Sequence, residues 1–557
     1  MDIRLLIDKG RASPIGALVL LLALAAGLLF FRLGVPGLMD PDEGRYAEIA
    51  REMWVRGDWI TPYLNQVKYL EKPPLVYWLT SLSLAALGKT ETAARLVPAL
   101  CALGGTLAVY GLGRVMFDPK AAVMAATVLL TSIGYVIMGR LLTLDMPLTC
   151  FLTWGIGLAY LALSRDRRAY LPWAYLSLAL ALLTKGLVAL VLPGLIFGAW
   201  ALARRDGQML LRLWHLRGLL ILLLVGLPWF VLVSLDNPEF LKYFFFQEHL
   251  ERYLTSYSHH GEPVYYFVGI LALGLLPWSF LLPWGLGQSL RPKILIDRQD
   301  TLFLWLWAGV VLLFFSLSRA KLAPYILPAL PPLALLLGKA LNGAEQGSDP
   351  ALNSCGITWS LLTWLILGLG MILIFLDPPA YWGQRIARLD FLSPYPLIGL
   401  IVLAATPALT LACRGWPRAR WAMLLIGAVA LNSTVILGME RVAGQRSGRA
   451  LAQVINANWQ PGEALIGYRV YLQSLEFYTG QDFFLYNIKG ELKFGSQHTP
   501  GVDLFLEQPE ALQKLVQHRP RVYLLVQDKD WPEVQNLFPQ QFQVLSVWRK
   551  GLLVANQ

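Results

Sequence analysis

Residues 14–48 read PIGALVLLLALAAGLLFFRLGVPGLMDPDEGRYAE, in which a long apolar run is followed by a dense group of charged side chains. The run 14–31 approaches the ~20 residues that a helix needs to cross a bilayer. Asp40-Pro41-Asp42-Glu43 then has the pattern of a helix start, with Asp40 as N-cap, Pro41 at the first helical position and Glu43 in a capping-box position. Apolar residues recur every three or four positions over 46–53, which predicts an interfacial helix.

The composition is that of a multi-span helical membrane protein. Of 557 residues, 56% are hydrophobic and only 15% are charged, whereas a soluble chain of this length carries more charge and shorter apolar runs. The net charge of +11 does not indicate nucleic-acid binding, because much of it lies in short loops where positive charge sets topology. The four cysteines are widely spaced in or beside apolar segments, which suggests neither a disulfide framework nor a zinc knuckle.

The apolar runs predict about thirteen transmembrane helices, near 14–33, 92–115, 121–139, 146–163, 170–184, 187–203, 218–235, 264–285, 301–316, 322–340, 356–376, 394–413 and 420–438. The shorter run 75–88 follows Pro73-Pro74 and is interpreted as an interfacial helix. With a cytoplasmic N-terminus, Lys and Arg then concentrate in the cytoplasmic loops, as in 165–168 and 204–217. Counting 75–88 as a span would reverse this bias, so the charge distribution favours thirteen.

The tail differs from the rest of the chain. It alternates strand-like pieces, 463–468 and 521–527, with helix-like pieces, 509–518 and 531–538. We therefore predict a transmembrane domain over 1–439, with a first outer loop at 34–91, and a small soluble α/β domain over 440–557. An odd number of spans places that domain outside the cytoplasm.

Several acids stand where the outer side of the membrane is predicted. Capping explains Asp40 and Glu43 but leaves Asp42 and Arg45 less explained, although Asp42 could simply favour the helix dipole. Asp145 opens an apolar span, where an N-cap role is the plain alternative. In Tyr69-Leu70-Glu71-Lys72-Pro73-Pro74 the two prolines favour a rigid turn that holds Glu71 and Lys72, while a solvated loop with a snorkelling lysine is the alternative.

Cations accompany these acids. Lys185 lies between two apolar runs with almost no loop, which favours an anion ligand over a snorkelling anchor. Ser318-Arg319-Ala320-Lys321, followed by Tyr325, places two cations and a tyrosine at a predicted outer helix start, where phosphate-sized anions are favoured. Glu248 and His249 could bind a divalent metal, whereas His259 and His260 fit a surface loop better.

The motifs resemble the GT-C glycosyltransferases that use polyprenyl-phosphate sugars, and most of all the lipid A aminoarabinose transferases. The matching pieces are Asp40–Glu48, Tyr69–Pro74, Thr184-Lys185-Gly186, Glu248–Arg252 and Lys321–Pro328. The resemblance covers residues 14–340 well and the tail weakly. The paired first-loop motifs are shared in outline by protein O-mannosyltransferases.

The resemblance implies a role for each matching residue. Asp42 and Asp145 would be the acids nearest the reacting centre. Lys72, Arg252 and Tyr325 would hold the lipid phosphate, supported by Lys185 and Arg319, with Arg45, Tyr69 and Lys321 also on the substrate. Glu71 would position Lys72 or, with His249, bind a divalent cation such as Zn²⁺, Mg²⁺ or Mn²⁺.

These observations predict a multi-pass glycosyltransferase of the bacterial inner membrane, monomeric, with its site and tail in the periplasm. It would move a sugar from a polyprenyl monophosphate to lipid A or a related acceptor, among membrane lipids and without nucleic acid. A protein O-glycosyltransferase with the same donor is the second hypothesis. A transporter ranks third, because transporters place polar sites near the midplane and often have inverted repeats.

Overall fold

The computed structural model describes residues 14–251, 262–289, 299–345, 395–413, 416–548 and 551–556. The chain divides into two compact units. Unit 1 comprises residues 1–31, 98–231 and 245–438, and unit 2 comprises 32–97, 232–244 and 439–557. The tail therefore groups with the segment 34–91, the predicted first outer loop of the transmembrane domain.

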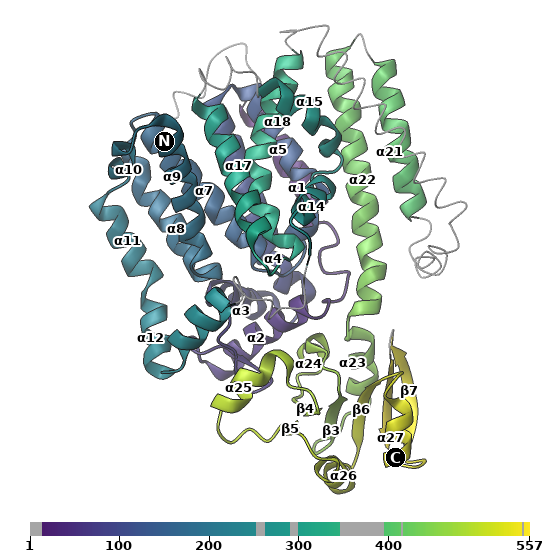
Figure 1. Ribbon diagram of the computed structural model, residues 1–557. Helices are drawn as coiled ribbons and strands as arrows, with labels where there is room; N and C mark the ends of the chain where they lie inside the picture. The colour runs from purple at the N-terminus through teal and green to yellow at the C-terminus, as the bar shows by residue number, and fades with distance from the viewer. Residues whose placement is uncertain are drawn as a thin grey trace. The chain divides into compact units, whose positions relative to one another are not determined.

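Unit 1 is helical, as the apolar runs predict (Figure 1). The boundaries between the units fall inside four helices, at 97/98, 231/232, 244/245 and 438/439. The elements are α1 (Pro14–Ala25), η2 (Ala26–Phe30), α4 (Glu91–Met116), α5 (Pro119–Leu130), α6 (Ile133–Gly139), α7 (Asp145–Ser164), η3 (Arg168–Tyr170), α8 (Leu171–Lys185), α9 (Val188–Arg204), α10 (Gln208–Arg212), α11 (Leu216–Gly226), α12 (Pro228–Asp236), η4 (Lys242–Glu251), α14 (Tyr266–Gly274), η5 (Trp278–Leu281), α15 (Leu282–Ser289), α17 (Gln299–Leu317), η6 (Ala323–Ala329), α18 (Leu330–Glu345), α21 (Tyr395–Ala412) and α22 (Pro417–Arg446).

The described helices establish a multi-pass membrane protein. By length and composition, 6 of them are long and apolar enough to cross a membrane, or up to 8 if each of two bent pairs is one span. One bent pair is α5 with α6, at 65°, and the other runs from α14 to Gly285, at 110°. The segments 14–30 and 188–204 are apolar but shorter. The predicted span 356–376 lies outside the described residues, and the total of thirteen stays a prediction.

Glycine lets two helices of unit 1 approach closely. α5 and α18 lie side by side (Figure 1). A Cβ atom added at Gly338 of α18 would lie 2.5 Å from the backbone nitrogen of Ala125 and 2.7 Å from the carbonyl oxygen of Ala121. Asn342 donates from its amide to Asp118 at 2.6 Å, and Asp118 also caps α5 by accepting from two backbone N–H groups of its first turn. Small residues therefore fix this helix pair.

Aromatic side chains hold three other helices of unit 1 together. Tyr160 of α7 stacks on Phe303 of α17 with ring centroids 4.0 Å apart, and Trp200 of α9 lies 5.0 Å from Tyr160 and 5.2 Å from Phe303. Such rings bury large apolar areas and add specific pair geometry. These contacts fix the C-terminal half of α7, the helix that begins at the predicted site residue Asp145.

Unit 2 begins with a helical pair and a short hairpin, namely α2 (Asp42–Arg56), β1 (Tyr63–Leu64), β2 (Val67–Lys68) and α3 (Leu75–Leu87). α2 ends at Arg56, and its C-cap residue Gly57 has a φ of +70°, which suits a residue without a Cβ atom. The Ser81 hydroxyl of α3 donates to the Ala50 carbonyl of α2 at 2.7 Å. The 13 residues of α3 extend about 20 Å at 1.5 Å per residue, well short of the ~30 Å hydrocarbon core. α3 therefore has the length expected of an interfacial helix.

The tail forms a six-stranded sheet with flanking helices, which confirms the predicted α/β architecture. The strands β3 (Ala464–Tyr468), β4 (Phe483–Tyr486), β5 (Phe505–Leu506), β6 (Val522–Gln527), β7 (Phe542–Trp548) and β8 (Gly551–Asn556) are ordered β5-β4-β3-β6-β8-β7. The first four are parallel, and β8 runs antiparallel to β6 and β7. The helices are α23 (Arg449–Asn456), α24 (Gln473–Thr479), η8 (Gly490–Leu492), α25 (Lys493–His498), α26 (Pro509–His518) and α27 (Trp531–Leu537).

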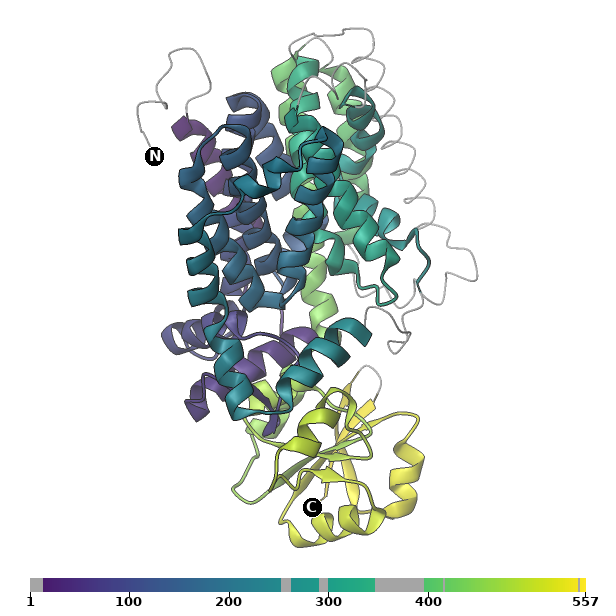
Figure 2. The same ribbon diagram turned by 60° about the vertical axis from the view of Figure 1, so that its left-hand side comes forward.

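Helices flank the sheet of the tail (Figure 2), and its core lies against α26 and α27. Ile466 of β3 and Leu524 of β6 pack with Leu512 of α26 and Val534 of α27, and all four side chains are fully buried. Because β3 and β6 are central, they read as nearly continuous apolar runs, which is typical of parallel strands covered on both faces. This explains why both strands were predictable from sequence.

Side-chain amides join the hairpin of unit 2 to the sheet. Asn65, at the turn between β1 and β2, donates to the carbonyl of Phe483 at 3.0 Å and accepts from its backbone nitrogen at 2.9 Å. Gln66 donates to Asp482 at 2.8 Å. The fully buried Asn65 thus mimics a strand partner at the first residue of β4. Segments more than 400 residues apart in sequence form one structural body.

Candidate functional site

The predicted site residues fall into two groups. Unit 2 contains Asp42, Arg45, Tyr69, Glu71 and Lys72, whereas unit 1 contains Asp145, Lys185, Arg319, Lys321 and Tyr325. Arg252 lies outside the described residues, and so does the side chain of His249.

Arg45 is the centre of the group in unit 2. It projects from the first turns of α2, and its side chain is only 13% exposed. Its Nη2 donates to Asp42 Oδ1 at 2.9 Å, and its Nη1 lies 3.0 Å from Glu491 Oε2 and 3.2 Å from the Tyr69 hydroxyl. Burial alone would lower the pKa of Arg45, but Tyr69 and Glu491 raise it well above its ordinary value. Arg45 is therefore a permanent, well-held cation next to Asp42.

The second motif joins this network through Tyr69. Its hydroxyl donates to Glu71 Oε2 at 2.9 Å, and burial raises the pKa of Tyr69 well above its usual range. Lys72 Nζ donates to the backbone carbonyl of Glu71 at 3.1 Å. Pro74 then acts as the N-cap residue of α3. Asp42, Arg45, Tyr69 and Glu71 thus form one chain of polar contacts, with Lys72 at its end.

Asp40 does not cap α2, contrary to the prediction from sequence. α2 begins at Asp42 and its N-cap is Pro41, which makes no side-chain capping bond. The Asp40 carboxylate instead accepts from the backbone nitrogen of Ser474 at 2.7 Å and bonds its hydroxyl. Burial raises the pKa of Asp40 to about 7, although the bonds from Ser474 act in the opposite direction. The N-cap prediction for Asp40 was wrong because its partner lies in the tail.

Glu43 does satisfy a backbone group ahead of the helix, since it accepts from Met39 N at 3.0 Å. It also pairs with Arg95 at 2.7 Å, and both side chains are almost fully buried. Arg95 donates in addition to the carbonyls of Leu33, Pro36 and Gly37. This pair fixes the chain that leads into α2. It was not predicted from sequence, because Arg95 stands alone at the start of an apolar run.

Three predicted residues of unit 1 come together. Lys185 Nζ donates to Asp145 Oδ1 at 2.5 Å, and the same ammonium lies 4.4 Å from the centre of the Tyr325 ring. Asp145 is the first residue of α7 and Leu144 is its N-cap, so the N-cap alternative for Asp145 was wrong. Lys185 ends α8, and Gly186 follows with φ +80°. The side chains of Asp145 and Lys185 are 12% and 15% exposed.

Two cations near Tyr325 differ from each other in environment. Arg319 is exposed, whereas Lys321 is 7% exposed. The segment that contains Tyr325 is the 3-10 helix η6, which follows directly after Leu322, and α18 begins only at Leu330. The predicted helix start therefore exists, but as a 3-10 turn. Lys321 is a buried cation beside it, and its site role stays a prediction.

Glu491 and Gln473 were not predicted from sequence. Glu491 lies in η8 and accepts from Gln473 Nε2 at 2.6 Å as well as from Arg45. In sequence Glu491 stands in a polar stretch, Asn487–Lys493, that is typical of a surface loop. No local signal links it to Arg45.

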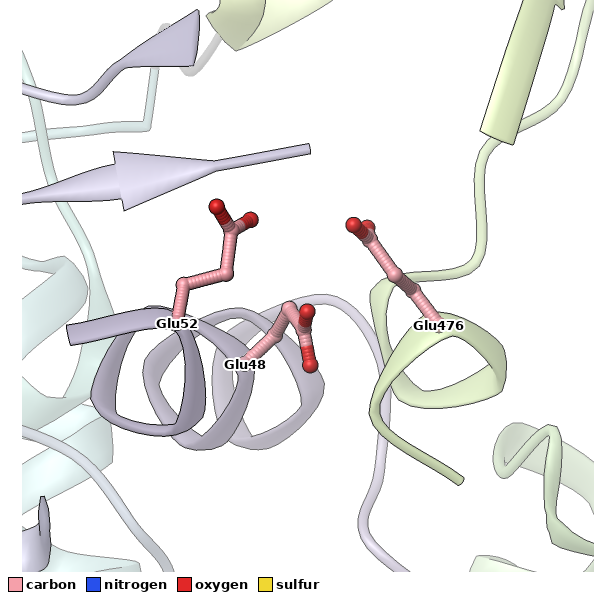
Figure 3. Close-up of side chains that lie close together, drawn as sticks. All are labelled: Glu48, Glu52 and Glu476. Atoms are coloured by element: carbon pink, nitrogen blue, oxygen red, sulfur yellow. The ribbon is translucent and has the colours of Figure 1, made fainter. Parts of the chain in front are cut away.

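One group of acids in the described part of the chain could hold a metal ion. Glu48 and Glu52 of α2 and Glu476 of α24 are buried, with ligand atoms within 4.8 Å of one another (Figure 3). Arg51 forms two bonds to Glu48, and Arg56 pairs with Glu52 at 2.9 Å. Tyr471 donates to Glu476.

The acids of this group have raised pKa values. Burial raises the pKa of Glu48 to about 7. Burial also raises the pKa of Glu476 well above its usual range, and the nearby charge of Glu48 adds to this effect. Two of these acids are paired with arginines, and burial favours the protonated form of the third, Glu476. The predicted metal ligands, Glu71 and His249, are different residues, and that prediction stays open because the His249 side chain is outside the described residues.

The architecture defines the class. Multi-pass helices, an α/β tail and motifs that combine acids with cations match the architecture of a solved GT-C glycosyltransferase. The family model described as dolichyl-phosphate-mannose-protein mannosyltransferase matches residues 71–231, and the one described as aminoarabinose transferase C-terminal domain matches 451–556. The crystal structure of ArnT from Cupriavidus metallidurans bound to undecaprenyl phosphate is 27% identical, with a TM-score of 0.83 over 98% of both chains.

Sequence relatives give the family. The undecaprenyl phosphate-alpha-4-amino-4-deoxy-L-arabinose arabinosyl transferase of Pseudomonas savastanoi pv. phaseolicola is 34% identical over 424 residues, 74% of this chain and 75% of its own. The enzyme of the same description from Pseudomonas aeruginosa (strain LESB58) is 32% identical over 495 residues, 85% of this chain and 86% of its own. The chain belongs to this family of arabinosyl transferases and is a glycosyltransferase.

Proposed function

We propose that this protein transfers 4-amino-4-deoxy-L-arabinose from undecaprenyl phosphate to lipid A at the periplasmic face of the bacterial inner membrane. The carrying observation is the likeness, over 98% of both chains, to an ArnT that was crystallised with undecaprenyl phosphate. The relatives' names state both the lipid phosphate and the pentose. The mannosyltransferase family model over 71–231 supports a lipid-phosphate sugar as donor, and makes a protein acceptor the second candidate.

The group formed by Asp145, Lys185 and Tyr325 in unit 1 contains side chains that can bind a phosphate. Lys185 places its amino group in a largely buried position, and Tyr325 adds a phenol beside it. A lipid monophosphate carries between one and two negative charges near neutral pH, and charge-assisted bonds to it are strong. Lys72, Arg252 and Arg319 are proposed as further phosphate ligands. These cations would stabilise the charge that grows on the phosphate as the sugar leaves, as oxyanion-hole donors do.

The proposed role of Asp42 depends on the chemistry of the acceptor. If the acceptor is a lipid A phosphate, its oxygen attacks the anomeric carbon, the bond from that carbon to undecaprenyl phosphate breaks, and no base is needed. Asp42 would then steady positive charge at the sugar or orient its amine. If the acceptor is a hydroxyl, Asp42 would be the general base. A divalent cation at Glu71 and His249 is proposed only as an addition, and chelation of the purified enzyme followed by a transfer assay tests it.

A transfer assay tests the proposal. Purified enzyme is given undecaprenyl phosphate-aminoarabinose with lipid A or with a Ser/Thr-rich peptide, and the products are weighed by mass spectrometry. Lipid A that gains aminoarabinose is the expected product. Modified peptide and unmodified lipid A would favour the second candidate, and no product from either acceptor would contradict both.

Orientation needs its own test. A reporter fused after residue 445 is expected on the periplasmic side, and one inserted at residue 208 in the cytoplasm, because Lys and Arg concentrate in the loops predicted to be cytoplasmic. A cytoplasmic reporter at 445 would place the tail on the wrong side for a periplasmic acceptor.

A further inference from the structure

The first turn of α2 is held by two elements of the tail. Ser474, in the first turn of α24, donates its backbone N–H to Asp40. A Cβ atom added at Gly44 of α2 would lie 2.3 Å from the nitrogen of Ser474 and 2.8 Å from its Cα, so the two backbones are in direct contact. Gln473, one residue earlier, donates to Glu491. Helix α24 and η8 therefore hold the segment that contains Asp42 and Arg45.

Glu491 is the link between the tail and Arg45. Its carboxylate is 20% exposed and has two partners, Arg45 Nη1 through Oε2 and Gln473 Nε2 through Oε1. Arg45 uses its other terminal nitrogen for Asp42, whose side chain is 55% exposed. A pair three residues apart on one helix is weak when neither side chain has another anchor. The anchor here is Glu491, with Tyr69 on the same nitrogen.

We infer that Glu491 is a positioning residue for the transfer reaction, and this inference rests on the proposed function, in which Asp42 acts at the sugar or its acceptor. Glu491 fixes the Arg45 guanidinium and shares its charge, so that Arg45 orients Asp42 without neutralising it. Without Glu491, the buried Arg45 charge has Asp42 as its remaining acidic partner among these contacts. The positive charge of Arg45 next to Asp42 is then no longer offset by Glu491, so the Asp42 carboxylate stabilises positive charge at the sugar less well and accepts a proton less readily. The tail thus acts on the reacting group through one arginine.

The test compares Glu491→Gln with Glu507→Gln in the purified full-length enzyme. Glu507 is a matched control because it is 64% exposed and pairs with Lys489 in the same part of the tail. We expect Glu491→Gln to lower kcat about tenfold while the affinity for undecaprenyl phosphate stays within about twofold. The acidic limb of its kcat–pH profile should move to lower pH. Glu491→Asp, which keeps the charge, should recover part of kcat, and Glu507→Gln should match wild type.

A double-mutant cycle identifies the route. If Glu491 acts through Arg45, Glu491→Gln should have little further effect in an Arg45→Lys background. Additive effects on kcat, or wild-type kcat in Glu491→Gln, would overturn the inference. Loss of folding in Glu491→Gln, or a Tm that falls in step with kcat, would assign Glu491 to the fold and overturn it too. A wild-type enzyme that transfers no sugar would instead contradict the proposed function.

Discussion

The ammonium of Lys185 and the carboxylate of Asp145 meet at 2.5 Å, where the end of one predicted span faces the beginning of another. A cation at a helix C-terminus and an acid at a helix N-terminus both interact favourably with the helix dipole. The pair is therefore satisfied structurally before any substrate is considered. Its functional role has to be separated from that structural one by experiment.

Lys185→Ala should weaken undecaprenyl phosphate binding by one to two decades, because one charge-assisted contact is worth roughly 1.5–3 kcal/mol. It should also lower Tm, since Asp145 is left buried without this partner. Adding Asp145→Asn should restore Tm but not affinity, as measured by lipid titration and thermal unfolding in detergent. Lys339→Ala, which removes a lysine bonded to Thr301, is the control for binding. Recovered affinity in the double variant would make the pair purely structural.

Asp42→Asn should reduce transfer to near background while Tm stays close to wild type. The Asp42 side chain is 55% exposed, so its charge contributes little to the fold, and surface changes usually cost within ~0.5 kcal/mol. Mass spectrometry of lipid A and thermal unfolding measure the two effects. Asp503→Asn, an exposed acid of the tail, should alter neither. Full turnover by Asp42→Asn would remove Asp42 from the reaction.

The fold was largely readable from sequence, because apolar runs and buried strands follow burial directly. The strand Ala464–Tyr468 and the helix Pro509–His518 coincide with the predicted 463–468 and 509–518. Helix boundaries in unit 1 were harder, since bends such as that between α5 and α6 leave no clear signal in an apolar run.

The site was only partly readable. Lys185 could be recognised because a lysine between two apolar runs is costly without a partner. The partners of Asp40 and Arg45 could not, because Ser474 and Glu491 lie more than 400 residues away in ordinary polar segments. The local pattern Asp40-Pro41-Asp42-Glu43 therefore predicted Asp40 as an N-cap residue. A long-range hydrogen bond that overrides a capping pattern has no sequence signature within one chain.

Asp40 should make unfolding depend on pH. Its pKa is about 7 in the folded protein against an ordinary 3.8, so between these values the folded state binds more protons than the unfolded state. The free energy of unfolding should therefore fall as pH rises from about 4 to 7, by up to roughly 1.4 kcal/mol per pKa unit. Asp40→Asn should flatten this fall relative to wild type, as seen in Tm measured across that range. Asp528→Asn, an exposed acid, should keep the wild-type slope.

The cluster of Glu48, Glu52 and Glu476 should respond differently to the loss of different acids. Because burial and the neighbouring acids raise the pKa of Glu476, its neutral form is favoured, and Glu476→Gln should change Tm little. Glu48→Gln should cost at least ~1 kcal/mol more, because Arg51 loses the carboxylate that accepts two of its bonds. Thermal unfolding at a pH above 7, where Glu48 is ionised, compares the two variants with and without Mn²⁺ or EDTA. A wild-type Tm that rises with Mn²⁺ and no longer does so in Glu476→Gln would show that the cluster binds a cation and that Glu476 is ionised there.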